Sequence, residues 1–600
     1  MEFKAADPDR AFLDVEHSLT GQRWEQRLDQ AGRNRALAMA QNYGMSELVA
    51  RVLAGRGVGL SEVEQFLDPT LKSLMPDPSI LADMDRAAER LAQAIRSGQR
   101  IAIFGDYDVD GACSSALLKR YLDHYGVPSE IYIPDRIFEG YGPNPTAITE
   151  LIGRGAEVIV TVDCGSTSHE SLSVAAARGV DVVVIDHHQL GVDLPPCRAL
   201  VNPNREDDLS GQGHLCAAGV VFLVLVAVQR LLRQTQQEGH ARIELLSLLD
   251  LVALATVCDV VPLKGLNRAF VVKGLAAARL LGNPGLAALV RSAGIGGPLT
   301  PYHFGFLIGP RINAGGRIGD AALGSRLLTL DSPAEADAIA ARLEDLNRER
   351  QAMEKVMLQQ AEAEAMAEYR DGTGPAIFVA AQEGWHAGIV GLIASRLKDQ
   401  LRRPAFAIAF GANGMGTGSG RSITGFDLGR IVRQAVEEGL LVKGGGHAMA
   451  AGLTVERAKL GALRGFLEEK AGDRVAQLAA INRLRIDGAL SASGATMDLV
   501  DRLEAAGPYG AGHPQPVFAV PRHRVVDVRA VGVNHLKVSL AGADGSRLEA
   551  MAFRQAESDL GRALIDGRGQ EFHVAGTIAA EHWQGNRRIQ MRILDAARAN

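Results

Sequence analysis

The stretch RIAIFGDYDVDG (100–111) decides the fold, because a short apolar run (IAIF, 101–104) ends directly in a cluster of carboxylates. Two further runs repeat this arrangement: EVIVTVD (157–163) ends in Asp163, and DVVVIDHH (181–188) ends in acidic and histidine side chains. Helix-like stretches separate the three runs, and such alternation predicts a parallel α/β sheet. Ligands of such sheets bind at the carboxyl ends of the strands, so we expect a functional site where the three runs end.

The first run carries Asp106, Asp108 and Asp110, which alternate along the chain. Alternate residues of an extended segment share one face, so the three carboxylates can point the same way just past the strand end. Gly111 then permits a tight turn, and we expect a helix to begin near Ser114.

Acidic and histidine residues in four segments are candidate metal ligands. They are Asp106, Asp108, Asp110, Asp163, Asp186, His187, His188 and, in ATVCDVVPL (255–263), Asp259. A single Asp at a strand end is more often a helix cap or a turn residue. Four such segments in one α/β unit are harder to explain in that way, since converging carboxylates repel one another unless cations lie between them. Oxygen ligands with a minority of imidazole suit Mn²⁺ or Mg²⁺, so we expect two divalent ions that promote phosphoryl transfer.

The order DxDG, VD, DHH and a later Asp resembles the DHH phosphoesterase superfamily. Within it the chain is most similar to bacterial RecJ-type exonucleases, from about residue 70 to the C-terminus. The motifs that carry the likeness are GDYDVDG (105–111), DHHQ (186–189), PRINAGGR (310–317), EGWHAGIVGLIASRL (383–397), GGGHAMAAG (444–452) and GPYGAGHPQPVF (507–518). The resemblance implies a metal-dependent 5′→3′ exonuclease that degrades single-stranded DNA to 5′-mononucleotides in DNA repair and recombination.

The resemblance also implies a role for each acidic and histidine residue. It implies that the metal ligands are Asp108, Asp110, Asp163, His187 and Asp259, with Asp106 as an additional ligand or a carboxylate behind them. Asp163 would bridge the two ions, His188 would contact the scissile phosphate, and Asp186 would orient the histidine pair. The catalytic set would then be Asp108, Asp110, Asp163, His187, His188 and Asp259.

A further set of residues is expected to bind the substrate. It comprises Arg136, His188, Arg311, Asn313, Arg317, Trp385, His386, Ser419, Arg421, Gly445, Gly446 and His447. Ser419 and Arg421 stand where RecJ-like proteins read a 5′-phosphate, and the planar fork of Arg suits that group. Successive glycines let a backbone approach a phosphate chain closely. Any single Arg could instead form an ion pair on the surface, and Trp385 could instead be part of the hydrophobic core.

The expected fold class is α/β: a parallel-sheet DHH domain, a smaller α/β DHH-associated domain joined to it by a long helix, and a C-terminal β-barrel. The charged, Ala-rich stretch 332–368 predicts the long helix, and short strands after about residue 480 predict a barrel of the oligonucleotide-binding (OB) type. The expected boundaries are 1–75 (N-terminal helical segment), 76–330 (DHH domain), 331–370 (connecting helix), 371–475 (DHH-associated domain) and 476–600 (OB-fold domain).

Composition narrows the class of protein. A net charge of −6 argues against a protein that coats nucleic acid non-specifically. The five cysteines form no CxxC pair, so neither a structural zinc site nor a disulfide framework is expected, and the compartment is reducing. The N-terminus has no apolar core, and the apolar run 216–228 is too short to span a bilayer. We therefore expect a cytoplasmic protein that does not contact a membrane.

Two other kinds of function remain open. A DHH phosphodiesterase for short oligonucleotides or cyclic dinucleotides, or a pyrophosphatase or polyphosphatase, would share the metal core, although a small substrate needs no third domain. An inactive DHH scaffold that only binds would be expected to lose metal ligands, and here every position of the pattern carries a competent residue. The resemblance implies single-stranded DNA as the substrate, single-strand-binding protein and a RecQ-type helicase as partners, and a monomer.

Overall fold

The computed structural model describes residues 10–135, 139–234, 243–369, 374–479, 482–583 and 586–599. The chain forms two compact units. The larger unit contains Pro76–Val261 and Phe270–Ile481. The smaller unit contains Met1–Met75, Pro262–Ala269 and Asn482–Asn600.

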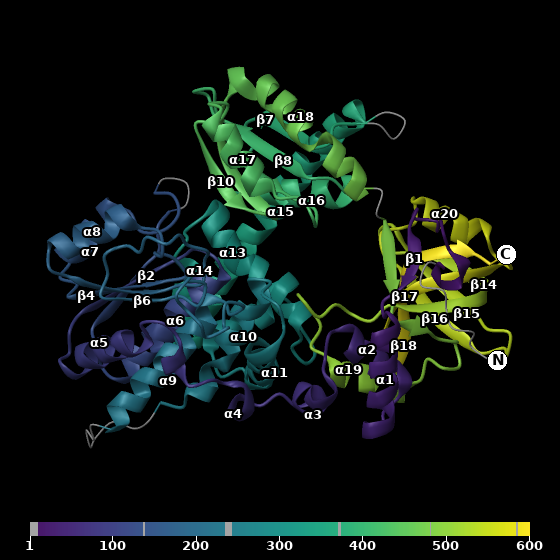
Figure 1. Cartoon of the computed structure of the whole chain (residues 1–600), viewed down its shortest axis with the longest axis horizontal. Coiled ribbons are helices and arrows are strands. Elements are labelled where there is room, and N and C mark those ends of the chain that lie inside the picture. The colour runs from purple at the N-terminus through teal and green to yellow at the C-terminus, as the bar shows by residue number, and fades with distance from the viewer. Residues whose placement is uncertain are drawn as a thin grey trace. The chain divides into compact units, whose positions relative to one another are not determined.

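A parallel five-stranded sheet lies at the start of the larger unit, as the apolar runs predict. Its strands, in spatial order, are β3 (Ser129–Tyr132), β2 (Ile101–Gly105), β4 (Val158–Val162), β5 (Asp181–Ile185) and β6 (Ala199–Val201). β2 and β4 are buried along their whole length, because helices cover both faces of the sheet. The helices α7 (Pro145–Gly153) and α8 (His169–Ala177) lie on one side, and α5 (Met84–Arg96) and α9 (Ala217–Gln234) on the other (Figure 1).

The helix after β2 begins earlier than expected. We expected a start near Ser114, but α6 spans Val109–His124 and Asp108 is its N-cap, whose carboxylate accepts from the Gly111 N–H at 3.0 Å. Gly111 therefore lies inside the first turn. A Cβ there would lie 2.4 Å from the carbonyl oxygen of Asp106, so glycine is needed for a close backbone approach rather than for a turn.

A helical region follows the sheet. Its elements are α9, α10 (Leu249–Cys258), α11 (Gly265–Ala278), α12 (Pro284–Ser292), the π-helix η5 (His303–Ile308), α13 (Gly309–Ile318) and α14 (Leu323–Thr329). Among the helices that the structure describes, α9 alone is long and apolar enough to cross a membrane by length and composition, yet 67% of it is buried inside the protein. It is a core helix, as the run 216–228 indicates.

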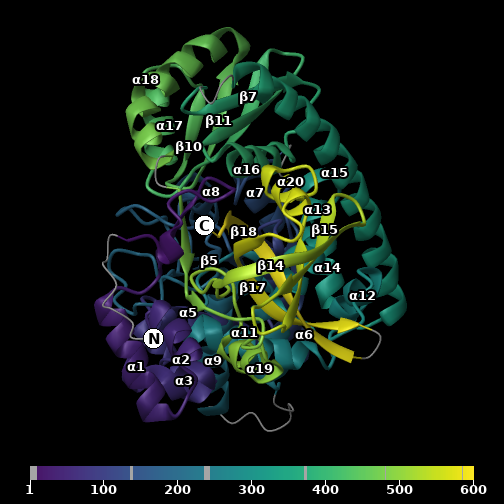
Figure 2. The same cartoon turned by 90° about the vertical axis from the view of Figure 1, so that its right-hand side faces the viewer.

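The predicted connecting helix is confirmed. α15 runs without interruption over the 36 residues Pro333–Glu368, and Figure 2 shows it along the side of the larger unit. The Ser332 hydroxyl accepts from the Glu335 N–H and caps its start. The helix then leads to a second sheet.

This second sheet has the spatial order β10 (Lys443–His447), β11 (Ala450–Glu456), β9 (Met415–Arg421), β8 (Ala405–Phe410) and β7 (Phe378–Glu383). The sequence AFAIAF of β8 alternates small and large side chains. The alanines pack with α16 (Val390–Leu401), and Phe406, Ile408 and Phe410 pack with α17 (Leu428–Glu437) and α18 (Leu460–Ala479). Each face of the strand is thereby matched to its own layer of helix.

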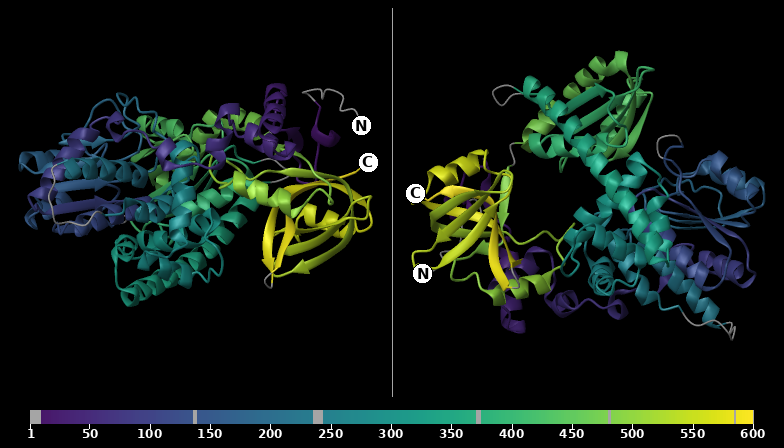
Figure 3. Two further views of the ribbon diagram at one scale, coloured as in Figure 1. Left: turned by 90° about the horizontal axis from the view of Figure 1, so that it is seen from below. Right: turned by 180° about the vertical axis from the view of Figure 1, so that it is seen from behind.

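The smaller unit contains the expected C-terminal barrel. The strands β14 (Phe518–Val531), β15 (His535–Ala541), β16 (Arg547–Ala552), β18 (Asn586–Arg598) and β17 (Glu571–Trp583) follow one another, and β17 pairs with β14. That last pairing closes the sheet, which Figure 3 shows in yellow from two sides. Closure pairs the first and last strands of this order and encloses an apolar core built around Val538, Leu540 and Phe572.

The N-terminal segment packs with this barrel as part of the smaller unit. β1 (Arg23–Gln26) pairs in parallel with β12 (Arg483–Ile486), and α1 (Gln30–Tyr43) and α2 (Glu47–Gly55) follow it. The indole N–H of the fully buried Trp24 donates to a carboxylate oxygen of Asp595 at 2.8 Å. The segment is therefore a mixed α/β cover on the barrel, where the sequence indicated helices alone.

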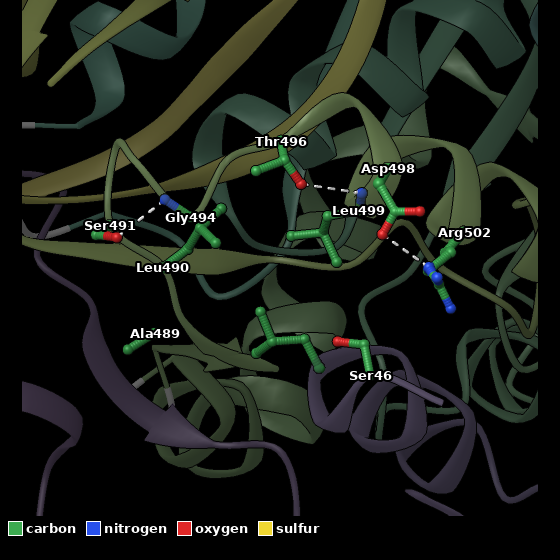
Figure 4. Close-up of a pocket in the computed structure, with 10 residues that line it drawn as sticks. Ser46, Ala489, Leu490, Ser491, Gly494, Thr496, Asp498, Leu499 and Arg502 are labelled. Carbon is green, nitrogen blue, oxygen red and sulfur yellow. Dashed lines mark hydrogen bonds and ion pairs between the residues drawn. The ribbon is translucent and has the colours of Figure 1, made fainter. Parts of the chain in front are cut away.

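A shallow cavity of about 370 Å³ lies between α2 and α19 (Met497–Ala506) of the smaller unit (Figure 4). Several of its polar side chains have partners within the same wall. The hydroxyl of Thr496 accepts from the Leu499 N–H, and Asp498 pairs with Arg502 at 2.8 Å. These contacts cap and stabilise α19, and so they account for Thr496, Asp498 and Arg502.

Candidate active site

The four segments singled out in the sequence meet at the carboxyl edge of the parallel sheet. Asp106 and Asp108 follow β2, Asp163 follows β4, and His187 and His188 follow β5. Asp110 lies in the first turn of α6, and Asp259 is the C-cap of α10.

The Nε2 atom of His187 lies at the centre of this cluster. It is 3.3 Å from Oδ1 of Asp163, 3.7 Å from Oδ2 of Asp110 and 3.7 Å from Oδ2 of Asp259. The Nδ1–H of the same ring donates to the carbonyl oxygen of Leu215 at 3.1 Å, which leaves the Nε2 lone pair directed at the carboxylates. His187 is therefore held in the tautomer that a metal ligand requires.

Three overlapping groups have ligand atoms within 4.8 Å of one another. They are Asp106–Asp108–Asp163, Asp163–His187–His188 and Asp110–His187–Asp259. Asp163 and His187 each belong to two groups. Ligand groups that share residues in this way could hold two adjacent ions.

Backbone geometry directs two of the acids. Asp163 adopts a left-handed conformation (φ 60°), which turns the chain sharply at the end of β4. The carboxylate of Asp110 accepts from the N–H groups of Ala217 and Ala218 at 2.7 and 2.8 Å, at the N-terminus of α9. Free N–H groups at a helix start hold an anion well, so Asp110 is fixed from behind.

Asp186 orients the histidine pair from behind. Its Oδ1 accepts from the backbone N–H of His187 and, at 2.8 Å, from Nδ1 of His188. Burial raises the pKa of Asp186. The hydrogen bond from His188, the charge of that ring and the hydrogen bond from the Ser166 N–H have a larger effect, so the pKa of Asp186 lies well below its ordinary value. Burial likewise opposes protonation of His188, but Asp186 raises its pKa to about 9.

The other carboxylates repel one another. Burial is the largest cause that raises the pKa of Asp163, and the charges of Asp110, Asp108, Asp106 and Asp259 add to it. Burial first, and then Asp110 and Asp108, also raise the pKa of Asp259. Such a cluster is unstable as a set of bare anions.

Divalent cations fit this cluster. Oδ1 of Asp163 and Oδ2 of Asp259 are buried and accept no hydrogen bond from any residue that the structure describes. Cations would occupy these open acceptors and cancel the repulsion. Carboxylate oxygens with one or two imidazole nitrogens are the donor set of Mn²⁺ and Mg²⁺.

A cavity of about 490 Å³ opens beside Asp186 and His188. His447 of β10 lines it together with the loop 165–171, so the structure brings this predicted residue to the histidine pair. Tyr141 also lines it, and its hydroxyl lies 3.3 Å from the carbonyl oxygen of Asp163 and 3.4 Å from the His188 ring. The sequence reasoning missed Tyr141, which lies in the segment FEGYG (138–142).

The predicted substrate residues of α13 are already held by neighbours, with one exception. Arg311 pairs with Glu344 of α15 at 2.7 Å, and Arg317 donates to the carbonyl oxygen of Gly388 at 2.9 Å. Oδ1 of Asn313 is buried and accepts no hydrogen bond from the described residues. Arg136 lies outside the described residues.

The residues of EGWHAG have local partners. Trp385 is buried in the core beside α16, and its indole N–H donates to Gln360 at 2.7 Å. This position favours packing for Trp385 over contact with substrate. Nδ1 of His386 accepts from the Gly388 N–H at 3.1 Å, which fixes that ring.

Ser419 and Arg421 lie together on β9, where Nη1 of Arg421 donates to the Ser419 hydroxyl at 2.9 Å. Ala450 of β11 pairs with both Arg421 and His447, so these two residues stand two strands apart in one row of the sheet. Gly429 allows α17 to pack directly on β10, because a Cβ there would lie 2.5 Å from the Gly446 carbonyl oxygen. A Cβ on Gly445 would meet nothing within 4 Å, which leaves that strand face open.

Three family models match the chain. The DHH family, N-terminal domain, matches residues 100–256, the DHHA1 domain matches 374–473, and the RecJ OB domain matches 486–595. The first range contains the parallel sheet with Asp106 to His188, and the third contains the closed barrel.

Relatives extend the match to almost the whole chain. The single-stranded-DNA-specific exonuclease RecJ of Dickeya dadantii is 36% identical over 565 residues, which cover 91% of this chain and 95% of that protein. RecJ of Bacillus subtilis is 33% identical over 96% of this chain and 71% of that protein. The crystal structure of RecJ in complex with Mn²⁺ from Thermus thermophilus superposes with a TM-score of 0.77 at 30% identity, over 96% of this chain and 78% of that one. The chain therefore belongs to the RecJ family.

Proposed function

We propose that this protein is a metal-dependent exonuclease that degrades single-stranded DNA from the 5′ end and releases 5′-mononucleotides. The observation that carries the proposal is the convergence of five acids and two histidines, with Asp163 and His187 each shared between two ligand groups. RecJ relatives that are named single-stranded-DNA-specific exonucleases support it. So do the RecJ structures in complex with Mn²⁺ and with Mg²⁺.

The residues present can hold two divalent ions, Mn²⁺ or Mg²⁺. The proposed ligands are Asp106, Asp108, Asp110, Asp163, His187 and Asp259. When bound, the ions would activate the attacking water and neutralise charge that develops in the transition state. The protein itself holds two of these ligands in position before substrate binds. The carbonyl oxygen of Leu215 orients His187, and the N–H groups at the start of α9 orient Asp110.

His188 is the proposed contact to the scissile phosphate. Its Nδ1–H is bonded to Asp186, so Nε2 is the atom left to face the substrate, and the neighbouring acid favours a protonated ring. A protonated imidazole donates to a phosphate oxygen and offsets its charge. Tyr141 restricts the same ring from the cavity side.

The remaining predicted residues would hold the strand. We propose that Ser419 and Arg421 bind the terminal phosphate, with His447, Gly445 and Gly446 beside the chain and Arg136, Arg311, Asn313, Arg317 and His386 as further contacts. The rows of β9 and β10 place Arg421 and His447 about 10 Å apart at Cα, since neighbouring strands are about 4.8 Å apart.

The barrel favours a long substrate over the two alternatives. A short-oligonucleotide or cyclic-dinucleotide phosphodiesterase needs no third domain, and an inactive scaffold needs no complete ligand set. We also propose the division into residues 76–330, 331–370, 371–475 and 476–600. We further propose that the enzyme is cytoplasmic and monomeric and that it acts in DNA repair and recombination. Its proposed partners are single-strand-binding protein and a RecQ-type helicase.

The test uses one single-stranded oligonucleotide that carries a label at its 5′ end or at its 3′ end, with Mn²⁺, Mg²⁺ or EDTA. The expected result is rapid release of the 5′-label as a mononucleotide, stepwise shortening of the 3′-labelled strand, and no reaction in EDTA. Cleavage of dinucleotides with long strands left intact would instead support a small-substrate enzyme. Strand binding without hydrolysis would support a scaffold.

A further inference from the structure

Two large aromatic side chains of the larger unit stack on each other in solvent. Tyr302 is 60% exposed and Phe306 is 69% exposed. Their ring centroids lie 5.2 Å apart with an interplanar angle of 24°. An exposed stacked pair costs the protein hydration free energy, so it usually marks a surface that binds something.

The pair is carried by an unusual and well-anchored helix. Phe306 lies within the π-helix η5, and Tyr302 immediately precedes it. π-Helical turns are rare and occur frequently at functional sites. The opposite side of the turn is buried, with Phe304 and Ile308 fully inside the core. The aromatic faces are therefore held outward by a rigid base.

This base adjoins the cluster of carboxylates and histidines. The thiol of Cys258, the residue before Asp259, donates to the carbonyl oxygen of Phe304 at 3.3 Å. Downstream, α13 packs against the other side of the cluster, since a Cβ on Gly316 would lie 2.9 Å from Cβ of Tyr107. The aromatic pair thus belongs to a helical turn that contacts the residue next to a proposed ligand.

The segment that carries the pair is strongly basic in an acidic chain. Between Phe270 and Asp320, within the larger unit, the sequence contains no Asp or Glu, and its cations are Lys273, Arg279, Arg291, Arg311 and Arg317. Arg291 and Arg311 pair with acids of α15. Arg279 is exposed and donates to the carbonyl oxygen of Leu299, three residues before Tyr302. An aromatic face close to an exposed cation such as Arg279 is complementary to bases on a phosphate chain.

We propose that Tyr302 and Phe306 form a platform on which bases of single-stranded nucleic acid stack on their way to the metal cluster. Stacking tolerates any base, because every base has a π face, and so the platform suits an enzyme without sequence preference. The inference rests on the proposed function and adds a binding site to it.

The test measures the affinity of the full-length chain for a fluorescent oligothymidylate by anisotropy, in EDTA so that the strand stays intact. Tyr302→Ala/Phe306→Ala and Tyr302→Leu/Phe306→Leu should each bind about ten-fold more weakly than the wild-type chain. Tyr302→Trp/Phe306→Trp should bind within about two-fold of it, because Trp restores the π face. Met366→Ala, at another exposed apolar residue of the same unit, should leave the affinity unchanged.

A strand of the same length without bases provides the second measurement. The wild-type chain and the alanine variant should bind it equally, since stacking is lost in both cases. Wild-type affinity in the leucine variant would contradict base stacking and support a general apolar contact with the strand. Wild-type affinity in the alanine variant would show that Tyr302 and Phe306 do not contact the strand. If the wild-type chain neither binds nor degrades single-stranded DNA, the proposed function itself fails.

Discussion

The carbonyl oxygen of Leu215 accepts the Nδ1–H of His187 at 3.1 Å, and this contact decides which ring nitrogen faces the carboxylates. Two residues later, the first N–H groups of α9 hold Asp110. One short backbone segment therefore orients a histidine and an acid that belong to separate motifs. The cluster is preorganised by groups that no motif contains.

Asp186→Asn should lower kcat for nucleotide release by about 10–100-fold, because it removes the charge that orients His188 while leaving the proposed metal ligands in place. Mn²⁺ affinity should stay within a few-fold of wild type. Single-turnover kinetics and calorimetry measure the two effects. Asp193→Asn, at an exposed position of the next loop, is the matched control and should change neither. Loss of Mn²⁺ binding in Asp186→Asn would show that this acid is a ligand.

Gly111→Ala should destabilise the larger unit by about 1–3 kcal/mol, since the new Cβ would lie 2.4 Å from the backbone oxygen of Asp106 and neither group can move freely. Asp106 and Asp108 should shift with it, so that Mn²⁺ binding weakens as well. Gly153→Ala is the control, because a Cβ at the end of α7 meets nothing within 4 Å. Thermal unfolding and Mn²⁺ titration check both variants. An unchanged unfolding temperature in Gly111→Ala would contradict the close approach.

Arg421→Gln should raise KM for a 5′-phosphorylated strand by about ten-fold and leave KM for a 5′-hydroxyl strand unchanged. The reason is that a guanidinium–phosphate contact contributes about 1.5–3 kcal/mol. Arg430→Gln, an exposed residue of the neighbouring α17, should have no effect on either substrate. Equal losses on both substrates would mean that Arg421 does not read the terminal phosphate.

His513 makes the stability of the smaller unit depend on pH. Its ring stacks on Tyr509 at 4.9 Å, and its Nε2–H donates to the carbonyl oxygen of Ala506 at 3.0 Å. Burial, with smaller contributions from Arg268 and Arg56, lowers the pKa of His513 to about 4. The unfolded chain has the ordinary value of about 6.5.

The folded unit therefore excludes a proton that the unfolded chain binds. The neutral His513 ring contributes fully to the free energy of unfolding above pH 6.5. This contribution falls by about 2–3 kcal/mol as the pH drops from 6.5 toward 4. His513→Gln keeps a donor for Ala506 without the titration, so its free energy of unfolding should change less over the same window. Urea unfolding at several pH values measures the difference. Parallel pH profiles for the two proteins would contradict the lowered pKa.

The sequence was sufficient for the sheet, the long helix, the barrel and the acidic segments, because each leaves a local pattern. Apolar runs that end in acids gave β2, β4 and β5, and parallel strands must bring those ends together. The AFAIAF alternation of β8 and the short strands of the barrel are equally local. These patterns depend on neighbours in the chain, which a sequence displays directly.

The features that the sequence did not reveal depend on contacts between distant residues or on the backbone. Trp24 and Asp595 are 571 residues apart, and nothing near Trp24 indicates that its segment covers a barrel. The N–H groups of Ala217 and Ala218 carry no side-chain signal. The predicted start of α6 was wrong because an Asp at position 108 is compatible with a metal ligand and with a helix cap. In the structure Asp108 is the N-cap of α6 and also belongs to one of the ligand groups.

The most direct test of the central claim is a calorimetric titration of Mn²⁺ into the wild-type chain and Asp163→Asn, with nuclease activity followed in parallel. Asp163 belongs to two of the ligand groups, so its loss should disturb both ions. The account predicts two Mn²⁺ ions per wild-type chain, loss of tight binding in Asp163→Asn, and a fall in kcat of about 1,000-fold. The fold should remain intact, because removing a repelled buried charge does not destabilise the metal-free protein. An Asp163→Asn protein that binds two ions and degrades single-stranded DNA at the wild-type rate would contradict it.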